Sequence, residues 1–220
     1  MIEERTIQVS SHGRYLVAAP ASLAAEFSAP VLMGFHGYAE DAAVHLERLQ
    51  TIPGVDRWLI VSVQALHRFY RGRSQDVVAS WMTRQDRELM IADNVAYVSA
   101  VVEAVSRERP VSGALVFSGF SQGVATAFRA AVHGSHQPAG VLAVGGDVPP
   151  ELDAAVLARV SRVLIGRGVR DDWYSSATFS SDERRLHAAG VDVTTHPFDG
   201  GHEWTADFSQ AAGEFLSRFS

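Results

Sequence analysis

The sequence ALVFSGFSQGVATAF, residues 114–128, decides the fold. Its first four residues form a short apolar run that predicts a buried strand, and residues 124–128 are typical of a helix. Between them stands Gly119-Phe120-Ser121-Gln122-Gly123, which matches the pattern G-x-S-x-G. In a strand–turn–helix context this pattern puts a serine on a strained elbow, where Gly119 and Gly123 let the two backbones approach closely. The alternative is an ordinary turn in which the serine only caps the helix.

Similar apolar runs recur on both sides of this elbow, and helical segments separate them. The predicted strands lie at 31–35, 58–63, 114–117, 141–144, 163–165 and 191–195. The predicted helices lie at 41–50, 86–109, 122–133, 151–159, 177–189 and 203–219. This alternation predicts an α/β fold with a mostly parallel twisted sheet and helices on both faces. Residues 6–10 and 14–18, around a glycine turn, predict an N-terminal antiparallel hairpin. We expect one domain over residues 1–220.

Composition removes several kinds of chemistry. The chain has no cysteine, and all 19 of its basic residues are arginine. Thiolate nucleophiles, thiolate-held metals and lysine Schiff bases are therefore excluded, and we expect neither a metal nor a cofactor. A net charge of −6 argues against nucleic-acid partners. No membrane span and no signal-peptide profile are expected, so a cytoplasmic location is the default, and the oligomeric state stays open.

A nucleophilic serine needs a base and a third group that orients the base. In a parallel sheet the ligand crevice lies beyond the carboxyl ends of the strands. His202 is the candidate base, because it stands in the loop between the last predicted strand and the last helix. The orienting acid has three candidates, Asp171, Asp172 and Asp199, in the loops after the last two predicted strands.

The oxyanion that forms during acyl transfer needs backbone N–H donors that already point at it. His36-Gly37-Tyr38 closes the first of the predicted parallel strands, and a backbone N–H there is one candidate. The N–H of Gln122, at the start of the helix after the serine, is the other, and the helix dipole reinforces it.

Residues 66–84 lack a clear period, and we interpret them as a lid or substrate loop over the crevice. The loop is rich in aromatic and arginine side chains, which would suit an acyl chain or an anionic leaving group. The candidate substrate contacts are His36, Phe69, Tyr70 and Trp81.

These residues resemble the phospholipase/carboxylesterase family of α/β-hydrolases, which includes the acyl-protein thioesterases. The resemblance runs from about residue 30 to the C-terminus. It rests on Phe-His-Gly at 35–37, Ser-Trp at 80–81, Gly-Phe-Ser-Gln-Gly at 119–123 and Gly-His-Glu at 201–203. It implies Ser121 as nucleophile, His202 as base, Asp171 as acid, and the N–H groups of Tyr38 and Gln122 as oxyanion donors.

The chain departs from the family pattern at three points. Ser175 replaces a proline, Val124 replaces a glycine, and two extra residues precede the acid. The acid is thus Asp171 or Asp172.

We therefore expect a serine hydrolase that cleaves carboxylic esters or thioesters of small molecules through an acyl-enzyme intermediate. The alternatives are a catalytically silent binding protein on the same fold, or a peptidase or lactonase that uses the same triad.

Overall fold

The computed structural model describes residues 1–19, 28–109 and 111–219. Within them the chain forms a seven-stranded sheet of order β1-β3-β2-β6-β7-β8-β9 and a separate hairpin, β4-β5. The strands are β1 (Arg14–Ala18), β2 (Ala29–Phe35), β3 (Leu59–Gln64), β4 (His67–Tyr70), β5 (Val77–Ser80), β6 (Val111–Phe120), β7 (Gly140–Val144), β8 (Arg162–Gly168) and β9 (Asp192–Phe198). The helices are α1 (Ala42–Gln50), α2 (Arg87–Glu108), α3 (Gln122–His133), α4 (Ala154–Leu157), α5 (Ser176–Ala188) and α6 (Ala206–Leu216), with 3-10 turns η1 (Val55–Arg57) and η2 (Ser217–Phe219).

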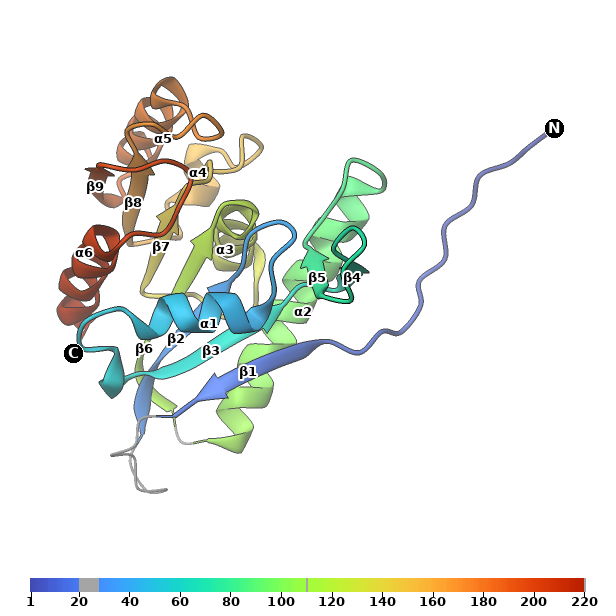
Figure 1. Cartoon of the computed structure of the whole chain (residues 1–220), viewed down its shortest axis with the longest axis horizontal. Coiled ribbons are helices and arrows are strands. Elements are labelled where there is room, and N and C mark those ends of the chain that lie inside the picture. Colours follow the sequence, from blue (N-terminus) through green and yellow to red (C-terminus); the bar gives the residue numbers. More distant parts are fainter. Residues whose placement is uncertain (20–27, 110, 220) are drawn as a thin grey trace.

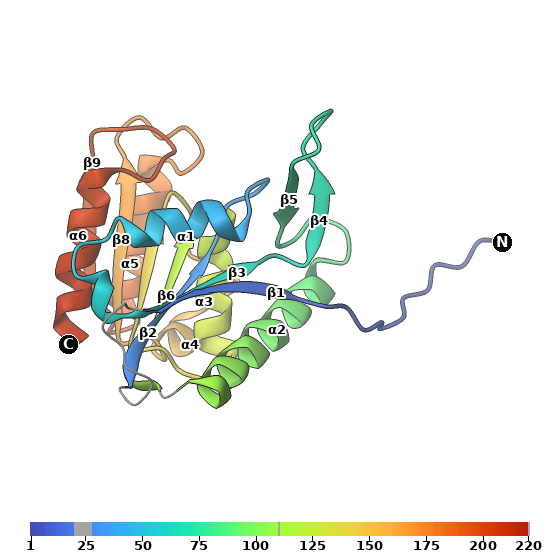
Figure 2. The same ribbon diagram turned by 60° about the horizontal axis from the view of Figure 1, so that its bottom comes forward.

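Helices cover both faces of the sheet (Figures 1 and 2). Side chains alternate across each strand, so β2 sends Met33 to one face and Leu32 to the other. On the Met33 side the core includes buried residues of α2, α3, α4 and α5. On the Leu32 side the core includes buried residues of α1 and α6. The expected mostly parallel sheet with helices on both faces is confirmed.

The N-terminal strand is antiparallel, as expected, but its partner is different. β1 pairs with β3, Arg14 opposite Gln64 and Ala18 opposite Ile60. Residues 6–10 form no strand and are exposed, so the predicted hairpin partner was wrong. Alternation of side chains in a short segment indicates an extended strand, but it does not say which strand the segment will pair with.

Helix α2 bears on another expectation. By length and composition it could cross a membrane, since an 18-residue window has a mean hydropathy of 1.4. Its Val98, Val101 and Val105 are buried in the core, but only 28% of that window is buried. By length and composition alone this helix differs from the sequence expectation, and the absence of a membrane span stays a prediction.

Residues 66–84 contain the β4-β5 hairpin, whose strands pair from His67 with Ser80 to Tyr70 with Val77. It projects from the body of the molecule (Figures 1 and 2). The pattern in these residues was not recognised as a strand pair, because the exposed residues of β4 do not alternate between buried and exposed positions.

Two glycines set the spacing between β6, α3 and β2. A β-carbon on Gly119 would lie 2.5 Å from the carbonyl oxygen of Gly123. One on Gly123 would lie 2.0 Å from the carbonyl oxygen of Phe35, at the end of β2. Both contacts are with backbone atoms, which cannot rotate away as a side chain can, so any residue larger than glycine must push the elements apart.

We expect Gly123→Ala to lower the free energy of unfolding by about 1–3 kcal/mol, because the added methyl overlaps the backbone of β2. Urea denaturation and the thermal midpoint would measure the loss. Ala96→Ser, at an exposed position of α2, is the control and should stay within about 0.5 kcal/mol of wild type. A Gly123→Ala variant as stable as wild type would contradict this reading of the contact.

Candidate active site

Ser121 stands between β6 and α3 in a backbone conformation that non-glycine residues rarely adopt. Its φ is 53° and its ψ is −119°. Its N–H donates to the carbonyl of Val144 at the end of β7, with an N···O distance of 2.9 Å. The neighbouring strand thus holds the elbow in place, and the strained turn lifts the hydroxyl to the carboxyl edge of the sheet.

The structure brings Ser121, His202 and Asp171 into one chain of hydrogen bonds. Nε2 of His202 lies 2.8 Å from the Ser121 hydroxyl, and its Nδ1 lies 2.9 Å from Oδ2 of Asp171. A carboxylate only accepts, so Nδ1 carries the proton and Nε2 is free to accept from the serine. This is the arrangement that a serine nucleophile requires.

The loop after β8 fixes the acid. Asp171 is 3% exposed, and its Oδ1 accepts from the N–H groups of Trp173 and Tyr174 at 2.8 and 2.9 Å. Asp172 is exposed, and Asp199 pairs with Arg170 at the surface. Of the three aspartates that the sequence left open, Asp171 is therefore the one that reaches His202.

Two backbone N–H groups, those of Gln122 and Tyr38, were expected from the sequence as oxyanion donors. Gln122 begins α3, and its N–H has no hydrogen-bond partner among the described residues. The N–H of Tyr38, in the loop after β2, also has no hydrogen-bond partner among the residues that the structure describes. The contact between Gly123 and Phe35 keeps these two loops adjacent.

Two of the expected substrate contacts are buried. His36 and Trp81 are 0% exposed. The indole N–H of Trp81 donates to the carbonyl of His36 at 2.8 Å, and its backbone N–H donates to Oε1 of Gln122 at 2.9 Å. These bonds hold the loops of the site together, and neither side chain lines the crevice at Ser121 and His202. Their role as substrate contacts stays a prediction. Aromatic character in the sequence cannot distinguish the two roles.

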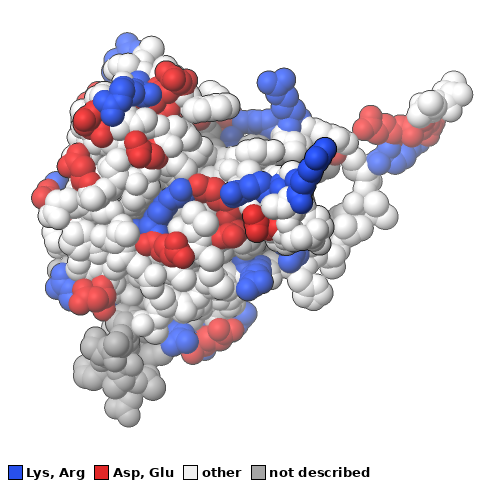
Figure 3. Space-filling view, in the orientation of Figure 1, with Lys and Arg blue, Asp and Glu red and all other residues white. Residues whose placement is uncertain are grey.

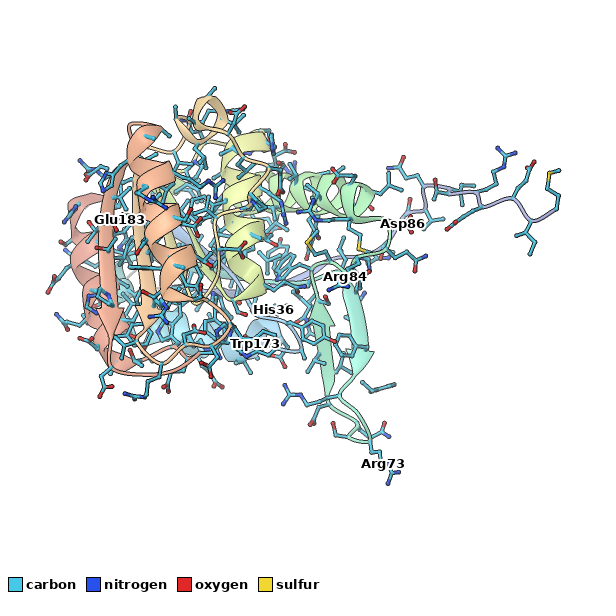
Figure 4. All side chains as sticks on the ribbon, turned by 90° about the horizontal axis from the view of Figure 1, so that it is seen from above. His36, Arg73, Arg84, Asp86, Trp173 and Glu183 are labelled. Atoms are coloured by element: carbon cyan, nitrogen blue, oxygen red, sulfur yellow. The ribbon has the colours of Figure 1, made fainter. Side chains whose placement is uncertain are left out.

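The other two, Phe69 and Tyr70, are exposed on the β4-β5 hairpin. Phe69 lies against Tyr38, with ring centroids 5.8 Å apart. Figure 4 shows Arg73 at the far end of this hairpin, away from His36 and Trp173. No residue of β4 or β5 lines the crevice at Ser121 and His202, whereas Met82, which also belongs to residues 66–84, does line it. The role of this segment as a lid or substrate loop stays a prediction.

A crevice of about 580 Å³ opens at Ser121 and His202. It runs along one face of α3 past Ala125 to Arg129. Its other lining residues are Met82, Arg87, Gln122, Gly145, Gly146, Asp147, Pro149, Pro150, Trp173, Tyr174 and Thr178. Most of these were missed by sequence reasoning, because they come from loops that only the fold brings together.

Charged and aromatic side chains lie along this crevice. Arg129 and Arg87 share the carboxylate of Glu151, with N···O distances of 2.7 and 3.1 Å. Trp173 is 86% exposed, and its ring centroid lies 6.3 Å from that of His202. On the molecular face seen in Figure 3, acidic and basic side chains are interspersed, with no large region of one sign. No group of three or more potential metal ligands occurs in the described part of the chain.

Comparisons with known proteins point to one family. The family model described as phospholipase/carboxylesterase matches residues 75–220. A Bacillus cereus carboxylesterase is similar in structure, with 19% identity, a TM-score of 0.70 and 94% of each chain covered. Acyl-protein thioesterase 2 of Zea mays gives 18% identity and a TM-score of 0.71, covering 94% of this chain and 99% of that one. No curated protein matches the sequence. At these identities the structural likeness shows a shared fold.

Burial favours the neutral form of two histidines, His36 and His45. Burial lowers the pKa of His36, whose Nδ1 donates to the Gly37 carbonyl at 2.7 Å while its Nε2 accepts from the Ala65 N–H at 3.0 Å. Burial, and then the nearby Arg48 charge, lower the pKa of His45 on α1 well below its usual value. In the unfolded chain both would bind protons near pH 6.5, so acid favours unfolding.

We expect the free energy of unfolding to fall as the pH drops below about 6.5, by up to about 1.4 kcal/mol per pH unit for each histidine. His45→Leu should remove up to half of this slope, because the unfolded chain then gains one proton fewer. Urea denaturation at a series of pH values would measure it. His12→Gln, at an exposed position, is the control, and equal slopes for wild type and His45→Leu would contradict the assignment.

Proposed function

Since the chain belongs to the phospholipase/carboxylesterase family, we propose that it hydrolyses small-molecule esters or thioesters, with Ser121 as nucleophile, His202 as base and Asp171 as acid. The expected α/β-hydrolase fold and family are confirmed. The observation that carries the proposed site is the unbroken chain from the Ser121 hydroxyl through His202 to Asp171, at 2.8 and 2.9 Å.

The reaction follows from this geometry. His202 takes the Ser121 proton as the hydroxyl oxygen attacks the carbonyl carbon. The N–H groups of Tyr38 and Gln122 bind the oxyanion that forms. When the tetrahedral intermediate collapses, His202 returns the proton to the leaving alcohol or thiol, and the acyl group stays on Ser121. A water then attacks the acyl carbon with His202 again as base, and His202 returns that proton to the Ser121 oxygen as the acyl–serine bond breaks and the carboxylic acid leaves.

Asp171 contributes by holding the base. Its Oδ1 is occupied by two backbone N–H groups, so only Oδ2 faces His202. A fixed carboxylate keeps the proton on Nδ1 and stabilises the imidazolium that forms during attack. The crevice beyond the serine has room for the acyl or the leaving group, and the exposed indole of Trp173 is available for contact with it.

We expect a fluorophosphonate probe to label wild type at Ser121 and to leave Ser121→Ala unlabelled. We also expect Ser121→Ala to lower kcat for a p-nitrophenyl ester by about 10⁶-fold, as loss of the nucleophile does in serine triads. Ser118→Ala, at a buried position three residues earlier in β6, is the control and should keep the label. Absence of labelling in wild type would favour a catalytically silent binding protein, and a loss below about tenfold would mean another nucleophile.

The two neighbouring aspartates give a separate test. Asp171→Asn should lower kcat by about 10⁴-fold, because the amide no longer holds the imidazole in the required tautomer. Asp172→Asn should remain within about threefold of wild type, since its side chain is exposed. Steady-state rates on the same ester would compare them. Impairment of the Asp172 variant alone would reverse the assignment.

A further inference from the structure

A salt bridge outside the triad supports the loop that carries Tyr38. Glu40 follows β2, and Arg48 lies in the last turn of α1. The guanidinium binds both carboxylate oxygens, each at 2.6 Å. The two side chains are only 17% and 21% exposed, so water weakens the interaction less than at an open surface.

Glu40 also binds the backbone beside the proposed oxyanion hole. Its Oε2 accepts from the N–H of Gly37 at 2.8 Å. The carbonyl of Gly37 meets Nδ1 of His36 at 2.7 Å. In a trans peptide the N–H points away from the preceding carbonyl. Anchoring Gly37 at both its N–H and its carbonyl therefore sets the direction of the Tyr38 N–H.

The rest of this loop is held as firmly. Ala39 adopts a left-handed conformation with a φ of 55°. Its N–H donates to the carbonyl of Ala79 on β5 at 3.0 Å, and the Ala79 N–H donates to the carbonyl of Glu40 at 2.8 Å. The residues on both sides of Tyr38 are therefore held by hydrogen bonds, while the N–H of Tyr38 itself has no partner among the described residues.

Arg48 connects the same loop to the nucleophile. Its guanidinium carbon lies 4.3 Å from the ring centroid of Phe120, the residue before Ser121.

Arg48 has a second effect, which is electrostatic. The Glu40 carboxylate binds the residue next to Tyr38, so an unpaired Glu40 would oppose negative charge on the substrate oxygen. The paired arginine cancels that charge.

We propose that Glu40 and Arg48 are positioning residues for ester hydrolysis: Glu40 orients the oxyanion donor of Tyr38, and Arg48 neutralises Glu40 and ties it to the serine elbow. This inference rests on the proposed function. Neither side chain lines the crevice at Ser121, so their effect is on the transition state and not on substrate binding.

Arg48→Met tests the electrostatic part, because it keeps an apolar stem against Phe120 and leaves Glu40 unpaired. We expect kcat for a p-nitrophenyl ester to fall by about 10- to 100-fold, with KM within about threefold of wild type. Glu40→Gln keeps an oxygen for the Gly37 N–H and should lose less than about tenfold. The double variant should be at least about threefold faster than Arg48→Met, because the opposing charge is gone. The rate of fluorophosphonate labelling should follow kcat.

The control is another pair of an arginine and a carboxylate in which the guanidinium also lies over an aromatic ring. Arg162 pairs with Asp192 at 3.3 Å and lies 5.6 Å over the ring of Phe219, at the other end of the strands. Asp192→Asn should leave kcat unchanged. Circular dichroism and thermal midpoints would establish folding, and Arg48→Gln would replace Arg48→Met if that variant did not fold.

The inference is overturned if a folded Arg48→Met keeps kcat within about twofold of wild type, or if the double variant is as slow as Arg48→Met. Both outcomes presuppose a wild type that is labelled at Ser121 and turns over the ester. An inactive, unlabelled wild type would instead reject the proposed function itself.

Discussion

The carbonyl oxygen of Phe35 lies so close to Gly123 that a β-carbon on this glycine would be only 2.0 Å from it. This single contact joins the end of β2 to the start of α3, and the site is built around it. The loop after β2 carries the N–H of Tyr38, and the first residue of α3 carries that of Gln122. Two N–H groups that we propose as oxyanion donors, more than eighty positions apart in the sequence, thus come from loops that lie next to each other. Without the close approach of the two backbones, Ser121 would stand beside one donor only.

Local patterns in the sequence predicted the elements well, because apolar runs and turn residues act over a few positions. The helix at 122–133 and the serine elbow agree with α3 and its N-terminus. Prediction failed where the partner is distant. The edge strand β1 pairs with β3 and not with its neighbour in sequence. His36 and Trp81 are aromatic and near the site, but they are buried by segments that no local pattern specifies. The Glu40–Arg48 pair was missed although its residues are only eight positions apart, because its role depends on the Gly37 N–H and the Phe120 ring, which the fold brings to it.

Every basic side chain of the protein is an arginine, and this affects how the loops around the site are held. Arginine has a planar fork of donors, so one side chain can hold several carbonyl groups at once. Arg185 binds the carbonyls of Val148, Pro149 and Leu152 in the loop before α4. Arg167 binds those of Tyr174 and Asp171 in the loop of the acid. These loops line the crevice or carry Asp171. Arg167 and Arg185 lie outside the arginine-rich loop at residues 66–84, and through these bonds they stiffen the walls of the site.

The backbone strain at Ser121 also links the proposed activity to the stability of the fold. A positive φ of 53° costs a serine more than it would cost a glycine. Glycine at this position would relieve that strain and at the same time remove the hydroxyl. At this one position, therefore, the residue that relieves the backbone strain is not the residue that we propose as nucleophile. Repeated selection for heat resistance alone would tend to drift toward an inert protein, and only a parallel demand for turnover would keep the serine in place.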